Sequence, residues 1–156
     1  MAEIRIYKFD NRLPSLNKYI KALNANRYIG QKMKNENEEL LRWQIIKQNN
    51  ENRYKQWGIE EKVDILFIWY VKNQKEDKDN ITFAKKFILD ALQKSRVLRG
   101  DGWRDISTLT DIVLISKDQG LTSDYSIEVV ITGISDELKT IQKKIKKFNK
   151  PIEKNL

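Results

Sequence analysis

The run K-V-D-I-L-F-I-W-Y-V-K at 62–72 constrains the fold more than any other stretch of this chain. It is almost continuously apolar, it is rich in β-branched and aromatic residues, and it is too short to span a bilayer. Such a run is typical of a strand at the centre of a sheet, with both of its faces covered by other elements. We therefore expect the chain to fold around one sheet with 62–72 as its central strand.

Weaker patterns supply the other elements. Alternation of apolar and polar residues predicts further strands at 3–9, 109–116 and 125–132. Helical spacing of apolar residues predicts helices at 31–54, 79–95 and 135–150, and the last of these is basic. Residues 10–26 contain Pro14 and several Asn and Ser residues, so we expect a long loop there, with room for a short turn of helix. A brief strand at 27–29, ending at Gly30, would follow it.

The 156 residues suit a single domain, because this length can bury a real core and no linker or internal repeat divides the chain. The predicted fold is α+β: one domain over 1–156, with a small mixed sheet of about four strands and helices packed on it. The first residues, M-A-E-I-R-I-Y-K-F, contain no apolar signal region. We therefore expect a cytoplasmic protein without a membrane partner.

The chain contains neither cysteine nor histidine. This excludes disulfides, Cys/His zinc sites, thiol nucleophiles and catalytic triads that use an imidazole base. A metal ion bound by such a chain would have oxygen ligands, which suit Mg²⁺, Mn²⁺ or Ca²⁺.

The net charge is +8, and the basic surplus lies towards the two ends of the sequence. Residues 1–50 carry ten basic and five acidic side chains, and residues 135–156 carry seven and three, whereas the middle is nearly balanced. A surplus of this size favours a polyanionic partner, with nucleic acid before an acidic membrane. Solvated surface lysine gives the same count, so the charge by itself does not decide between them.

Three aspartates flank the central predicted elements. Asp77 and Asp79 come directly after the buried strand, and Asp101 lies in a turn between Gly100 and Gly102. If that turn returns to the end of the strand, the three carboxylates form a hard-cation site that can activate water and brace the leaving oxygen of a phosphodiester. The alternative is structural, with Asp79 capping a helix and Asp101 forming a turn.

The residues around these acids resemble the RusA family of Holliday junction resolvases. The family pattern is D-x-D-N, a lysine, D-A-L on the helix and then an acidic turn; this chain has D-K-D-N at 77–80, Lys86, D-A-L at 90–92 and Asp101. The segment P-S-L-N-K-Y at 14–19 is similar to the family's P-S-x-N-basic-Tyr segment. The chain departs from the pattern by a longer spacing between Asn80 and D-A-L, and by one acid in the turn where the family usually has two.

The resemblance implies an α/β homodimer that resolves four-way DNA junctions by paired symmetric nicks in recombination and repair. It implies Mg²⁺ as the cofactor, with Mn²⁺ as a possible substitute, and metal-binding and catalytic roles for Asp77, Asp79 and Asp101. The family's lysine corresponds to Lys85 or Lys86. The spacing to D-A-L selects Lys86, and helical geometry agrees, since Lys86 would lie within about 20° of Asp79 on a continuous helix.

We expect the N-terminal loop and the start of the following helix to bind the DNA. The residues expected there are Lys18, Lys21, Arg27, Lys32 and Lys34 for phosphates, and Tyr19 for stacking on an unpaired base. Asn80 is expected to cap the helix and support the carboxylates.

Two other functions remain open: a less selective nuclease of DNA flaps or forks, and a non-catalytic basic DNA-binding module whose acids are structural. Asp64 with E-D-K at 76–78 also fits the PD-(D/E)xK nuclease signature superficially. That signature normally places its E-x-K on the strand after the one that carries the aspartate, whereas here both parts flank a single predicted strand.

Overall fold

The computed structural model describes residues 3–10, 12–120, 126–134, 140 and 143. Its sheet has the strand order β1 (Arg5–Phe9), β4 (Ser126–Gly133), β2 (Val63–Val71), β3 (Ile106–Ile115). The pairs β1–β4 and β4–β2 are antiparallel, and β2–β3 is parallel. The predicted α+β class, the four-stranded mixed sheet and the central position of β2 are therefore confirmed.

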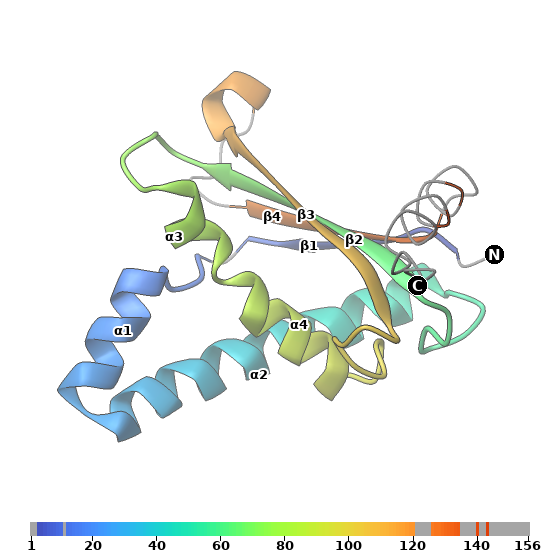
Figure 1. Cartoon of the computed structure of the whole chain (residues 1–156), viewed down its shortest axis with the longest axis horizontal. Coiled ribbons are helices and arrows are strands. Elements are labelled where there is room, and N and C mark those ends of the chain that lie inside the picture. The colour runs from blue at the N-terminus through green and yellow to red at the C-terminus, as the bar shows by residue number, and fades with distance from the viewer. Residues whose placement is uncertain (1–2, 11, 121–125, 135–139, 141–142, 144–156) are drawn as a thin grey trace, which may run out of the picture.

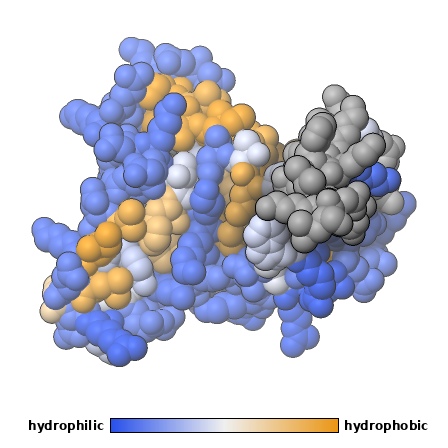
Figure 2. Space-filling view, viewed as in Figure 1, coloured by the Kyte–Doolittle hydropathy of each residue, from blue (hydrophilic) through white to orange (hydrophobic). Residues whose placement is uncertain are grey.

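The two faces of the sheet are covered to different degrees. Alternate residues of β2, from Val63 to Val71, are buried, and the residues between them are only half-buried. The prediction that both faces of this strand are covered is therefore wrong for the described part of the chain. Figure 2 shows apolar residues along β3, where Leu109 and Ile112 are 43% and 42% exposed. Leu109 pairs with the buried Ile65 and Ile112 with Ile68, so these two residues lie on opposite faces, and the edge strand β3 is partly open on both.

The more fully covered face carries α2 (Arg27–Asn52) and α4 (Lys85–Lys94), which lie on the same side of the sheet (Figure 1). The two helices pack against each other and against the sheet because their apolar residues recur at helical spacing. The largest buried side chains of the core include Tyr7, Phe67, Leu41, Ile45 and Phe87. Helix α4 lies in the crossover that connects the parallel strands β2 and β3.

The stretch expected to be a loop contains a helix, α1 (Leu16–Ala25). Ser15 caps its start by accepting from the N–H of Lys18 at 3.3 Å, and Asn26 both ends α1 and caps α2. The brief strand predicted at 27–29 is wrong, because these residues are the first turn of α2. Gly30 allows α2 to pack closely against α1, because a Cβ at this position would lie 2.3 Å from the Leu23 side chain of α1.

The helix predicted at 79–95 is broken into α3 (Lys78–Thr82) and α4, with Phe83 and Ala84 between them. The strand β3 is followed by a short 3₁₀ helix, η1 (Ser116–Gln119). No helix in the described ranges has the length and apolar character needed to cross a membrane. The basic helix predicted at 135–150 falls outside the described residues, apart from Thr140 and Lys143.

Candidate functional site

The carboxyl end of β2 leads into the acidic segment. Asp77 is the N-cap residue of α3 but makes no capping hydrogen bond through its side chain, and Asp79 lies in the first turn. One oxygen of Asp79 accepts from the N–H of Asn80 at 2.9 Å. Both aspartates are exposed, and neither forms an ion pair with a described residue. Their carboxylates are therefore open to a cation from solvent.

Asn80 joins this segment to the start of α1. Its Oδ1 accepts from the N–H of Asn17 at 2.9 Å, and its Nδ2 donates to Glu76 Oε2 at 3.3 Å. Glu76 in turn pairs with Arg12 at 3.2 Å. The two segments that carry the family resemblance, 14–19 and 77–80, are therefore in direct contact although 63 positions separate Asn17 from Asn80.

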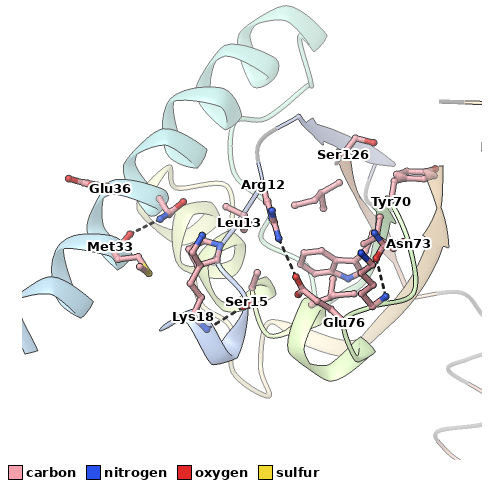
Figure 3. A pocket seen from close by; sticks show the side chains of 18 of the residues that line it. Arg12, Leu13, Ser15, Lys18, Met33, Glu36, Tyr70, Asn73, Glu76 and Ser126 are labelled. Atoms are coloured by element: carbon pink, nitrogen blue, oxygen red, sulfur yellow. Dashed lines mark hydrogen bonds and ion pairs between the residues drawn. The ribbon is translucent and has the colours of Figure 1, made fainter. Parts of the chain in front are cut away.

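A hollow of about 640 Å³ lies beside this contact (Figure 3). Its walls come from the segment before α1, the first turns of α2, the end of β2 and the loop that follows. Lys18 and Lys32, both expected to bind DNA, lie on its wall, together with Arg12 and Lys75. The hollow thus places basic side chains next to the segment that carries Asp77 and Asp79.

Asp101 lies at the opposite end of the sheet. Val63 pairs with Ile106 and Val71 with Ile115, so the loop before β3 lies at the start of β2, whereas Asp77 and Asp79 follow its end (Figure 1). Eight residue steps of strand span roughly 26 Å. The prediction that the turn brings Asp101 to Asp77 and Asp79 within one chain is therefore wrong.

The donor chemistry at the end of β2 nevertheless fits a magnesium ion. Mg²⁺ commonly binds one or two carboxylates and completes its coordination with water and substrate phosphates. Asp77 and Asp79 provide such oxygens, close to basic side chains that suit a phosphate. Within the described ranges, no group of three acidic residues lies close enough to hold a metal ion unaided.

The two lysines considered for the functional role differ in their surroundings. Lys85 binds the carboxylate of Asp111 on β3, and that carboxylate also accepts from the indole N–H of Trp69 at 2.9 Å. Lys86 is exposed and has no ion-pair partner among the described residues. The helical angle used to relate Lys86 to Asp79 does not apply, because the helix is broken between them.

Two of the predicted DNA-binding residues have structural partners instead. Lys34 is paired with the buried Glu38 at 3.7 Å and with Asp90 of α4 at 3.7 Å, so it joins α2 to α4. The ring of Tyr19 is partly buried and stacks on Phe83 with centroids 5.6 Å apart, so this neighbour already covers one of its faces. Lys18, Lys21, Arg27 and Lys32 are exposed on α1 and the start of α2, as a DNA-binding role requires.

The sequence reasoning missed part of the hollow, and its argument against a second acidic signature agrees with the structure. Arg12 and Lys75 were missed because they lie in segments without periodicity. The available signals were the position of Arg12 near Pro14 and that of Lys75 just after the central strand. Asp64 accepts from Thr108 at 2.6 Å near the start of β2, and Glu76 lies beyond its end. Asp64 and Glu76 thus lie at opposite ends of the same strand, as the argument against the PD-(D/E)xK signature expected.

Neither a protein-family model nor a curated protein sequence matches this chain. The resemblance to the RusA family rests on the residues quoted above, and the contact between Asn17 and Asn80 is a structural observation independent of them.

Proposed function

We propose that the chain is a metal-dependent endonuclease that resolves four-way DNA junctions by paired nicks. The observation that carries the proposal is the contact between the segments 14–19 and 77–80. Two distant stretches that resemble one family's functional motifs meet at the end of the central strand, beside a hollow with basic walls. Structural caps and turns would not require the two stretches to meet.

In this proposal Asp77 and Asp79 hold Mg²⁺, which supplies a water of lowered pKa and a positive charge for the scissile phosphate when it is bound. Asn80 is a positioning residue: its hydrogen bonds to Asn17 and Glu76 fix the loop on which both aspartates stand. Lys86 is free to stabilise the developing negative charge, since Lys85 is already paired with Asp111.

The proposed active molecule is a homodimer. A four-way junction has two equivalent strands related by a twofold axis, which a twofold dimer matches. Asp101 is exposed and lies at the far end of its own sheet, next to Trp103, which is 94% exposed. A role for Asp101 in the metal site therefore requires that it come from the partner chain.

The DNA arms would lie along the exposed basic residues of α1 and the start of α2. These residues are Lys18, Lys21, Arg27 and Lys32. The electrostatic attraction of such side chains for phosphates is independent of sequence and weakens with salt. Recognition of the branch would then depend on shape rather than on base sequence.

The second candidate is a DNA-binding module without catalysis. The observation in favour of this module is that, among the described residues of one chain, no three carboxylates lie close enough to hold a metal ion. A third, a nuclease that also cuts flaps and forks, uses the same carboxylates and differs only in its choice of substrate.

The deciding experiment is cleavage of a labelled mobile four-way junction with Mg²⁺, beside flap, fork and linear duplex substrates and a control with EDTA. Symmetric paired nicks in the junction only would support the resolvase. Cleavage of flaps and forks at a similar rate would favour the less selective nuclease. Tight binding without cutting in Mg²⁺ or Mn²⁺ would overturn both and favour the binding module.

A further inference from the structure

The hollow beside α1 has an apolar floor, and its walls carry four basic residues (Arg12, Lys18, Lys32 and Lys75) and two acidic ones (Glu36 and Glu76). Trp69 and Ala84 contribute buried surface, at 3% and 2% exposed, and Met33 and Ile81 line it from α2 and α3. Trp69 is nearly completely buried, its ring stacks on Phe67 and its indole N–H donates to Asp111, so it supports the floor from beneath, and the accessible apolar surface comes from Met33 and Ile81. The volume of about 640 Å³ is in the range of pockets that enclose small organic molecules.

The charged side chains stand on the walls and not on the floor. Lys18 and Lys75 are exposed and form no ion pair with a described residue, and Lys32 makes only a long contact of 3.8 Å with Glu36. Lys18 and Lys32 come from different helices, and Figure 3 shows Lys18 beside Met33 at the side of the hollow that faces α2. An anionic group is therefore expected at the mouth, above an apolar interior.

A flat aromatic ring joined to an anionic group matches this arrangement, and a nucleotide has that form, since the faces of its base pack on carbon surface. A purely apolar ligand would leave the lysines without a partner, and an inorganic anion would leave the floor empty. Bases at a DNA branch are easier to unpair than bases within a duplex, so extruding one costs less there.

We propose that the hollow binds one unpaired nucleotide, with its base against Met33 and Ile81 and its phosphate between Lys18 and Lys32. This inference rests on the proposed function and deepens it, because the nucleotide would belong to the DNA at the branch point. A free nucleoside monophosphate has the same chemistry, so the experiment separates the two sources.

The test uses the full chain in EDTA with a four-way junction that carries 2-aminopurine next to the branch. The fluorescence of this base rises when it leaves the base stack. We expect a several-fold rise on binding, and none with the linear duplex. In Ile29→Trp, a bulkier side chain narrows the hollow at a position that is 48% exposed, so the fold should tolerate it. The rise should disappear in this variant while the junction is still bound.

The matched control is Tyr28→Trp, which places the same side chain one residue away, outside the hollow and at a position 72% exposed. It should keep the full fluorescence rise. Calorimetric titration with deoxyadenosine monophosphate and with deoxyadenosine tests the second source. We expect Lys18→Ala to weaken monophosphate binding about tenfold, and Lys21→Ala, on the same helix but outside the hollow, to leave it unchanged.

Binding of the free monophosphate without a fluorescence rise on the junction would overturn insertion of a DNA base and leave a pocket for a free nucleotide. If the protein still cuts junctions but shows neither the fluorescence rise nor binding of the monophosphate, the inference is overturned and the proposed function stands. A pocket that binds the monophosphate in a protein that cuts no DNA would support the nucleotide site and overturn the nuclease.

Discussion

Tyr7 shows how one buried residue contributes to the response of this fold to alkaline pH. Its hydroxyl donates to Asn49 at 2.6 Å, and burial raises its pKa to about 12, although Arg5 acts in the opposite direction. The folded state holds this proton more tightly than the unfolded state, whose pKa is near 10. The resulting stability is complete below pH 10 and is lost as the pH rises towards about 12, by roughly 2–3 kcal/mol.

We therefore expect Tyr7→Phe to show a smaller loss of stability between pH 10 and 12 than the parent chain. At neutral pH the variant should be about 1 kcal/mol less stable, because one hydrogen bond is lost. Urea unfolding at a series of pH values measures both quantities. Identical pH slopes for the two chains would show that Tyr7 does not carry the effect.

A substitution of Asp79 by Asn tests the proposed chemistry, because it replaces one carboxylate oxygen by an amide nitrogen and removes the negative charge. In Asp79→Asn the remaining carbonyl oxygen can still accept from the N–H of Asn80, so the loop is kept. We expect unchanged junction binding and a loss of cutting in Mg²⁺ of at least about 100-fold, since one metal-binding charge is removed. Glu51→Gln, at the far end of α2, is the control and should cut normally. Normal cutting by Asp79→Asn would remove this residue from the mechanism.

At the scale of elements, the residues after α2 and after α4 are held together by a tight backbone contact. Ile59 and Leu98 form an isolated parallel bridge, and a Cβ on Gly58 would lie 2.8 Å from the carbonyl oxygen of Arg96. Because backbone cannot give way as a side chain does, Gly58→Ala should cost about 1–3 kcal/mol. Gly102→Ala meets nothing within 4 Å and should leave the melting temperature unchanged. Equal melting temperatures for the two variants would contradict this reading.

Lys32 and Lys34 are two residues apart on α2 but belong to different surfaces. Lys34 and Lys94 both pair with the buried Glu38, so Lys34→Gln should lower the free energy of unfolding by about 1 kcal/mol and leave DNA affinity alone. Lys32→Gln should leave stability alone, weaken junction binding and reduce its salt slope by about one. Chemical unfolding and binding at several salt concentrations measure the two effects. The opposite pattern would return Lys34 to the DNA surface.

At the scale of the whole molecule, the position of Asp101 makes a prediction about the dimer. If each site combines Asp77 and Asp79 of one chain with Asp101 of its partner, Asp79→Asn and Asp101→Asn chains should each be inactive. Coexpressed, they should form mixed dimers with one intact site, which nick a single strand of the junction. Strand-specific labelling measures this, and no recovery in the mixture would exclude a site shared between chains.

The sequence alone determined the elements whose periodicity records a buried face. The apolar run at 62–72 gave the central strand, and helical spacing gave most of α2 and α4, because the burial of a regular element repeats with its geometry. The absence of histidine and cysteine restricted any metal site to oxygen ligands. The segments 14–19 and 77–80 were also identified from residue types and spacing, before their contact was known.

The tertiary structure decided what depends on distant partners. Helix α1 was missed although Leu16, Tyr19, Ile20 and Leu23 recur at helical spacing and Ser15 precedes them as a cap, because Pro14 and the Asn and Ser residues of the segment were weighted as loop signals. Tyr19 and Lys34 looked free in the sequence, and only tertiary packing brought Phe83 against Tyr19 and Asp90 of α4 against Lys34. The separation of Asp101 from Asp79 follows from the parallel pairing of β2 and β3 through α4. A parallel crossover returns the chain to the opposite end of the sheet, so residue spacing alone could not place these carboxylates together or apart.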